Sequence, residues 1–212
     1  MSVRHAMTLV VLLCACTDGS EHSRAICALV DASGTYADER ARAVELLQRT
    51  LVRELRPGDS VILGLITGQS YTPENIVLRT RIEARPSVAL EQRTAVADAL
   101  ESLSAPTRAA RYTDISGGVL LCRDLLAETH AAKRTVLLLS DLVEDLKPGD
   151  VRELEDLDGL SVTAINVKRM AQDQKNPRRY RKRLDAFEDR VRTGGAREFR
   201  IVSSPERLVE IL

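Results

Sequence analysis

The sequence predicts a three-layer α/β/α fold, in which helices cover both faces of a doubly wound, mostly parallel sheet with one antiparallel edge strand. Two continuous apolar runs, at 26–30 and 135–140, are typical of strands that are buried on both faces. Between such runs lie segments whose apolar residues recur at spacings of three and four, as on one face of a helix. Strands that alternate with helices need crossover connections, and crossovers produce parallel strands.

The first half of the chain shows this alternation in order. After the first strand, the apolar spacing predicts a helix at 37–55, which Pro57 and Gly58 end. A strand at 61–67 follows. The segment at 76–82, IVLRTRI, alternates apolar and polar residues, which favours an exposed edge strand.

The second half of the chain continues the pattern. Ser87 stands where it can cap the next helix, and Pro205 stands at the first helical position of the last one. The expected helices lie at 87–103, 115–129, 177–191 and 206–211, and the expected strands at 135–140, 160–167 and 198–202.

Length and charge limit the class of the protein. The 212 residues suit one domain with a short appendage. With 44% apolar residues the chain can bury a core, which excludes a disordered chain. The 31 basic and 31 acidic residues balance, whereas proteins that clamp nucleic acid carry a basic excess. We therefore expect no nucleic-acid partner.

The first residues have the features of an export signal. Residues 6–15 form an apolar run after Arg4, shorter than the roughly 20 residues that span a bilayer. The run ends in Leu-Cys-Ala-Cys, which resembles the bacterial lipoprotein box. The resemblance implies that residues 1–15 are removed and that Cys16 is lipidated.

A tether and one domain would follow this signal. Residues 16–24 are polar and lack periodicity, and residues 25–212 form the predicted domain. The resemblance to lipoproteins implies a lipid anchor in the bacterial cell envelope. Because Thr17 rather than Asp follows the lipidated Cys, it implies the outer membrane, with the domain facing the periplasm. An ordinary secretory signal and an uncleaved anchor are the alternatives.

Hydroxyl and carboxylate side chains follow the ends of the predicted strands. Asp31, Ser33 and Thr35 come directly after the first strand, Thr113 precedes a helix, and Asp141 follows the central strand. Because the carboxyl ends of parallel strands meet at one edge of a sheet, we expect these side chains on a common rim. Their oxygens are the ligands that Mg²⁺ prefers.

This arrangement resembles the metal-ion-dependent adhesion site of von Willebrand factor A (VWA) domains. The family pattern has Asp-x-Ser-x-Ser after the first strand, a Thr in a later loop and an Asp after the fourth strand. Asp31, Ser33 and Thr35 match the first part, with Thr in place of the final Ser, while Thr113 and Asp141 match the other two. The similarity covers residues 25–212.

The resemblance implies a fold, a metal and a kind of partner. Ser33, Thr35 and Thr113 would contact Mg²⁺, or Mn²⁺ or Ca²⁺ in its place, and Asp31 and Asp141 would act through water or as supporting anchors. The metal would then accept an Asp or Glu carboxylate of a partner protein. The protein would be a recognition or adhesion module and not an enzyme.

Two other interpretations stay open. The run from Asp31 to Thr35 also suits a simple turn and helix cap, and Thr113 with Asp114 suits a helix cap, which would leave a metal-independent structural scaffold or assembly protein. Haloacid-dehalogenase-like phosphatases also place an Asp after the first strand. Their general acid is a second carboxylate two residues later, where this chain has Ser33, which cannot transfer that proton at neutral pH.

A basic segment lies near the carboxyl end of the chain. Between Lys168 and Arg200 there are twelve Lys or Arg residues and five Asp or Glu residues. The segment suits either a solvated helix that balances the acidic residues at 141–158, or a surface that binds anionic polymer, lipid head groups or an acidic partner.

Two further cysteines lie at a similar depth in the predicted fold. Cys27 stands about 13 Å before Asp31 along its strand, and Cys122 stands about 13 Å beyond Thr113 along its helix. An oxidising compartment would permit a disulfide between them. We expect instead two reduced, buried cysteines, which behave as small apolar side chains.

Overall fold

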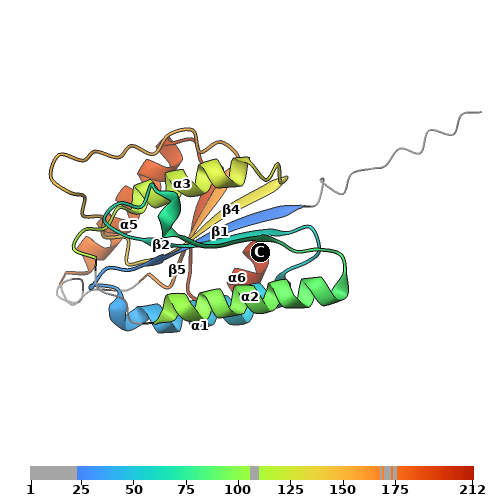
Figure 1. Cartoon of the computed structure of the whole chain (residues 1–212). Helices are drawn as coiled ribbons and strands as arrows, with labels where there is room; N and C mark the ends of the chain where they lie inside the picture. Colours follow the sequence, from blue (N-terminus) through green and yellow to red (C-terminus); the bar gives the residue numbers. More distant parts are fainter. Residues whose placement is uncertain (1–22, 106–109, 168, 170–172, 174–175) are drawn as a thin grey trace, which may run out of the picture.

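The computed structural model describes residues 23–105, 110–167, 169, 173 and 176–212 (Figure 1). The predicted signal at 1–15, the lipidation site Cys16 and most of the tether at 16–24 lie outside these residues. Part of the basic segment, at 168, 170–172 and 174–175, also lies outside them.

Six strands of the described chain form one sheet in the order β3-β2-β1-β4-β5-β6. β3 pairs antiparallel with β2, and the other neighbours pair in parallel, so the predicted mixed sheet with one antiparallel edge strand is confirmed. The strands are β1 (Arg24–Asp31), β2 (Ser60–Ile66), β3 (Ile76–Arg81), β4 (Lys133–Leu139), β5 (Leu160–Ile165) and β6 (Glu198–Val202).

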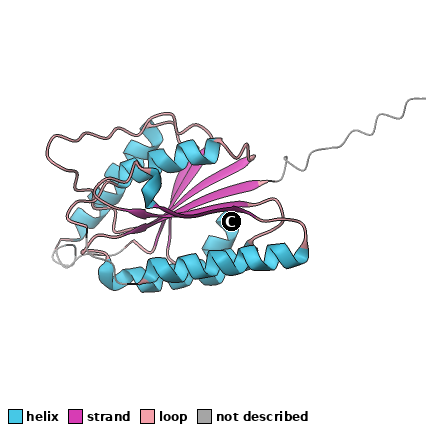
Figure 2. Ribbon diagram, in the orientation of Figure 1, coloured by secondary structure: helices cyan, strands magenta, loops and turns pink. Residues whose placement is uncertain are grey.

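Helices cover both faces of this sheet, which confirms the three layers (Figures 1 and 2). On one face lie α1 (Ala37–Glu54), α2 (Pro86–Ser104) and α6 (Pro205–Ile211); on the other lie α3 (Ile115–Ala127) and α5 (Pro177–Thr193). A single 3₁₀ turn, η2 (Pro73–Asn75), precedes β3. None of the described helices is both long enough and apolar enough to cross a membrane.

Two local predictions about element ends are corrected. Ser87 does not cap α2, because Pro86, which has no N–H to be capped, takes the first turn, and Arg85 at the cap position makes no side-chain cap bond. Arg24, which we assigned to the tether, is the first residue of β1, and its guanidinium Nε donates to Asp59 at 3.0 Å.

The central strand β1 is buried on both faces. Its alternate residues Ile26, Ala28 and Val30 belong to the core beneath α1, α2 and α6, while Cys27 and Leu29 belong to the core beneath α3 and α5. Every residue from Ala25 to Asp31 is buried. The continuous apolar run was the correct signal for a central parallel strand.

A disulfide joins the central strand to helix α3. Cys27 and Cys122 are bonded, with their Cα atoms 5.8 Å apart and both residues 0% exposed. The prediction of two reduced cysteines is therefore wrong, although their equal depth was correct. The helix packs closely on β1 because Gly118 has no side chain: a Cβ there would lie 2.8 Å from Cδ1 of Leu29. This close approach brings Cys122 within bonding reach of Cys27.

Candidate metal centre

Three loops meet at the carboxyl ends of the central strands. They follow β1, precede α3 and follow β4. The amide of Ala110 donates to Ala32 O at 3.2 Å, which joins the loop before α3 to the loop after β1. Thr113 and Asp145 exchange two backbone hydrogen bonds, at 2.7 and 3.0 Å, which join it to the loop after β4. Four residues of the predicted metal site, Ser33, Thr35, Thr113 and Asp141, lie on these loops, and the fifth, Asp31, is the last residue of β1.

Asp31 ends β1 as a carboxylate that is 0% exposed. Its Oδ1 accepts a hydrogen bond from the Ser33 amide at 2.7 Å, and its Oδ2 accepts one from the Ser140 hydroxyl at 2.6 Å. Burial raises the pKa of Asp31, and the nearby charge of Asp141 raises it further, while the bonds from Ser140 and Ser33 act in the opposite direction. An ionised Asp31 is therefore costly unless positive charge is near it.

The hydroxyls of Ser33 and Thr35 lie close to each other in the loop after β1. Their oxygens are 3.0 Å apart. Two oxygen ligands at right angles on Mg²⁺, each about 2.1 Å from the ion, are about 3.0 Å apart. The observed spacing therefore suits either a direct hydrogen bond or two neighbouring positions of an octahedral site.

Asp141 supplies a second buried carboxylate, also 0% exposed. Its Oδ1 accepts from the Val143 amide at 2.9 Å. Its Oδ2 is buried and has no hydrogen-bond partner among the described residues. A buried carboxylate oxygen without a donor is unfavourable, and a cation or a cation-bound water would satisfy it. The residues of this edge therefore fit a divalent cation.

Thr113 is 5% exposed, and its backbone is fixed by the two bonds to Asp145. The cap of α3 is the next residue: Asp114 Oδ1 accepts from the Gly117 amide at 2.8 Å. Gly117 is required there, because a Cβ would lie 2.2 Å from Asp114 Oδ2. Since Asp114 performs the capping, the hydroxyl of Thr113 is not needed for it.

One residue that the sequence analysis missed holds the first loop. Arg40, 3% exposed, reaches back from α1, and its Nε donates to Asp31 O at 3.0 Å. Its Nη2 lies 3.4 Å from Ser33 O. Tyr36 is also buried; its hydroxyl has no hydrogen-bond partner in the described part of the chain, and burial raises its pKa above the ordinary range. In the sequence, Arg40 is one of several charged residues on an amphipathic helix, so its bonds to the loop after β1 could not be predicted.

The donor set explains why the site lacks the usual metal-site pattern. Among the residues the structure describes, no group of three or more His, Cys, Asp or Glu side chains is placed to hold a metal ion. Here three of the five candidate ligands are hydroxyls. Mg²⁺ binds through few carboxylates and keeps several waters, so such a donor set remains suitable for it.

No protein-family model and no curated protein match the chain. Its fold does resemble solved structures. The PilB minor pilin of Streptococcus sanguinis, as its D319A mutant, matches with a TM-score of 0.50 and 13% identity, over 91% of this chain and 60% of that one. The fold of the chain is thus similar to that of this pilin.

Two other solved structures are similar to a lesser degree. The manganese-loaded TRAP protein of Plasmodium vivax matches with a TM-score of 0.49 and 16% identity, over 91% of this chain and 72% of that one. The von Willebrand factor type A protein of Catenulispora acidiphila matches with 0.46 and 15%, over 90% and 41%. The chain thus spans 41% of the Catenulispora protein and 60% of the pilin, and at these identities the likeness concerns the fold alone.

A polar network connects the loop after Asp141 to helices α3 and α5. Glu144 Oε1 accepts from the Ser116 amide at 2.7 Å, and Oε2 accepts from Arg190 Nη1 at 2.7 Å. Arg190 Nη2 also donates to the Ser116 hydroxyl at 2.5 Å. The network fixes this loop against both helices, and with it the position of Asp141. The sequence analysis treated Glu144 only as one member of an acidic run.

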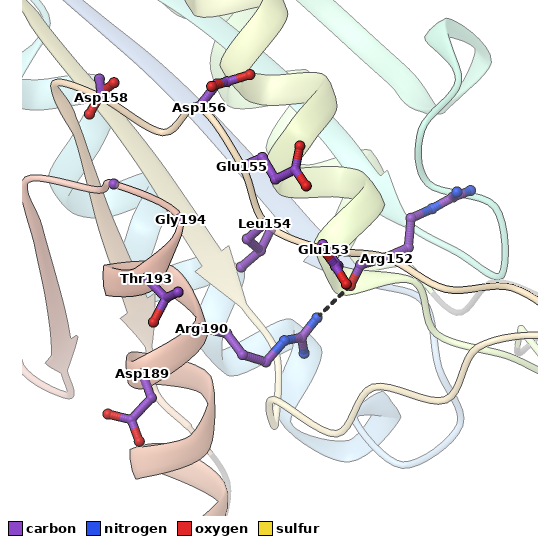
Figure 3. Close-up of a pocket in the computed structure, with 11 residues that line it drawn as sticks. Arg152, Glu153, Leu154, Glu155, Asp156, Asp158, Asp189, Arg190, Thr193 and Gly194 are labelled. Carbon is purple, nitrogen blue, oxygen red and sulfur yellow. Dashed lines mark hydrogen bonds between the residues drawn. The ribbon is translucent and has the colours of Figure 1, made fainter.

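Arg190 also borders a pocket away from the rim. This pocket, about 660 Å³, lies between the segment at 152–158 and the end of α5 (Figure 3). Arg190 Nη2 donates across it to Arg152 O at 3.3 Å. The other charged residues that line it, beyond the two arginines, are the acidic Glu153, Glu155, Asp156, Asp158 and Asp189. The pocket is therefore unsuited to an anionic ligand.

We predict that Asp31→Asn stabilises the metal-free protein near neutral pH. The pKa of Asp31 in the folded state is raised above 3.8, so its stabilising contribution is present below pH 3.8 and is lost as the pH rises through the folded pKa. Asparagine keeps the Oδ1 acceptor for the Ser33 amide but carries no charge. Urea unfolding in EDTA should show the difference in free energy between variant and wild type growing from about pH 4 to pH 7.

The exposed Asp98 on α2 provides the matched control. Asp98→Asn should leave the pH profile of the wild type unchanged. If Asp31→Asn instead lowers the free energy of unfolding by the same amount at every pH, the buried charge of Asp31 does not destabilise the metal-free protein.

Proposed function

We propose that this protein is a recognition module that binds a partner protein through a divalent cation at the rim. Asp31, Ser33, Thr35, Thr113 and Asp141 would hold the cation. The observation that carries the proposal is the buried pair of carboxylates, Asp31 and Asp141, of which Asp141 Oδ2 has no donor among the described residues. Mg²⁺ suits the 3.0 Å spacing of Ser33 and Thr35, and Mn²⁺ or Ca²⁺ are the alternatives.

The bound cation would act as a Lewis acid that accepts a carboxylate from the partner. The charges of the candidate ligands favour this role. Ser33, Thr35 and Thr113 offer neutral hydroxyls, so they do not cancel the charge of the cation. Hydrogen bonds from Ser33, Ser140 and Val143 hold the carboxylates of Asp31 and Asp141 in place. These two carboxylates would therefore support the site through water or as anchors. An Asp or Glu side chain of a partner is the ligand that such a cation favours.

A metal-independent scaffold is the second candidate. The observation that favours it is that Asp31 accepts a hydrogen bond at each carboxylate oxygen from the chain itself. The same two bonds disfavour a phosphatase, because a nucleophilic carboxylate must be free to attack and Asp31 is 0% exposed. Such phosphatases also use a Lys near the phosphate. Lys133 cannot take that role, because it is the first residue of β4 and so lies at the end of the strands opposite the rim. We propose that the protein is not an enzyme.

We predict that the full chain, stripped of metal, binds one equivalent of Mg²⁺. Isothermal titration calorimetry should give a saturable heat, and Asp31→Ala should weaken the affinity at least about tenfold, since it removes one of two buried carboxylates. Asp98→Ala, at an exposed site on α2, is the matched control and should bind as the wild type does. Equal affinity in Asp31→Ala and wild type would refute the metal proposal.

We also propose that the protein is exported and anchored by lipid at Cys16 in the bacterial outer membrane, with its domain in the periplasm. The buried disulfide between Cys27 and Cys122 supports export, because disulfides persist in the periplasm and are rare in the cytosol. The chain enters the sheet at the amino end of β1, opposite the rim (Figure 1). A tether at that end would leave the rim accessible to a partner.

We predict that Cys16→Ser releases the protein from the membrane. Expressed in a bacterial host with a lipoprotein pathway, the wild type should partition into the detergent phase and incorporate a palmitate analogue. Cys16→Ser should do neither, because the thioether cannot form. Cys14→Ser is the matched control and should behave as the wild type. Membrane association and labelling of the Cys16→Ser protein would contradict the anchor.

A further inference from the structure

The start of α5 carries four exposed cationic side chains. The side chains of Arg178, Arg179, Arg181 and Lys182, here called the cationic patch, are exposed. None of them has an ion pair or a side-chain hydrogen bond in the described part of the protein. Other basic residues nearby do have such partners: Arg183 pairs with Asp173, Arg190 with Glu144, Arg192 with Glu188 and Arg200 with Glu198.

Their position in the helix is unfavourable for folding. A helix N-terminus carries partial positive charge and favours acidic side chains. The first turn of α5 has no acidic residue, and four cations within five positions also repel one another. Asp185, four positions after Arg181 and three after Lys182, offsets only part of this charge, so the start of α5 stays positive and an anionic partner would relieve the repulsion.

The cationic patch lies on the same side of the sheet as the candidate metal centre. β5 is parallel to β4, so the chain leaves β5 at the rim and α5 starts on that side of the sheet (Figure 1). A hollow of about 280 Å³ separates the loop after Asp141 from α5, with Val143 on one side and Ala186 on the other. Ala186 also lines a second hollow, of about 450 Å³, together with the basic Arg178, Arg181 and Lys182 and the acidic Asp185 and Asp189.

The two hollows share Ala186 as a lining residue. Arg178 stands eight positions before Ala186, about 12 Å along the helix, a distance that about four residues of extended peptide would span. A segment whose carboxylate bound the cation could therefore place further acidic residues, a few positions away, against the cationic patch.

Acidic residues adjoin the cationic patch on α5. Asp185 and Asp189 are exposed and line the same hollow as Arg178, Arg181 and Lys182. Asp189 also borders the pocket of Figure 3, whose wall at 153–158 is acidic. An acidic segment would therefore be attracted to the start of α5 and repelled from Asp185 onwards.

We infer that the cationic patch is the second half of the partner interface and binds acidic residues that flank the carboxylate at the cation. The inference rests on the proposed function, since it places both contacts in one partner protein. Lipid head groups of the anchoring membrane are disfavoured as the ligand, because the chain enters at the amino end of β1, and the cationic patch lies at the other end of the sheet.

The test uses a fluorescent octaglutamate peptide and the full chain in Mg²⁺, with binding followed by anisotropy. The neutralised variant carries Arg178→Gln, Arg179→Gln, Arg181→Gln and Lys182→Gln. Its dissociation constant should rise at least about tenfold, and its dependence on salt should fall, because each exposed cation contributes a screened attraction. An unchanged Mg²⁺ titration of the variant shows that it is folded.

The matched control removes the same charge from another surface. It carries Arg49→Gln, Arg53→Gln, Arg56→Gln and Arg85→Gln, four exposed arginines on and near the far ends of α1 and α2. This control should bind octaglutamate within about twofold of the wild type, since only distant charge has changed. An equal loss in both variants would overturn the inference, because net charge alone would explain it.

The remaining outcomes separate this inference from the metal proposal. Octaglutamate that binds both variants like the wild type, and is released by EDTA, overturns the cationic patch and leaves the metal site standing. Binding that needs the cationic patch but survives EDTA and Asp31→Ala supports the cationic patch and overturns the metal function. Octaglutamate that does not bind, with phosphatidylglycerol vesicles that bind through the cationic patch, overturns the acidic-protein partner in favour of lipid.

Discussion

The burial of a charged carboxylate at the end of the central strand is the constraint on which the site depends. β1 is covered on both faces, so the Asp31 carboxylate is fully buried, and Asp141 brings a second carboxylate near it. Two negative charges in such a place are unfavourable without compensation. The chain offers hydroxyl and amide donors to three of the four oxygens and leaves Asp141 Oδ2 without one among the described residues. A divalent cation would provide the missing compensation.

The fold holds this rim rigid from several directions. The disulfide between Cys27 and Cys122 fixes α3 on β1, and each of these elements leads to a loop that carries candidate ligands. Arg40 fixes the backbone after β1, and Glu144 with Arg190 fixes the loop after β4. Because the donors are positioned before any ligand arrives, little order has to be gained on binding. The same framework places the cationic patch of α5 on the side where a bound partner would extend.

The sequence predicted the architecture well because periodicity alone encodes it. The apolar run of β1 and the alternation of IVLRTRI correspond to a central strand and an edge strand. Sequence periodicity could not predict the contacts that depend on how helices and strands pack against one another. Arg40, Ser140 and Glu144 reach the site from positions that a solvated residue could equally occupy. The disulfide depended on the separation of α3 and β1, which Gly118 sets.

The central claim is that one divalent cation lies among the oxygens of these three loops. Anomalous diffraction from crystals of the full chain soaked in Mn²⁺ would test it most directly. The account predicts a single anomalous peak bonded to the hydroxyls of Ser33, Thr35 and Thr113, with Asp31 and Asp141 bound through water or at its side. An empty rim, with Ser33 and Thr35 still hydrogen-bonded to each other and manganese bound elsewhere, would contradict it.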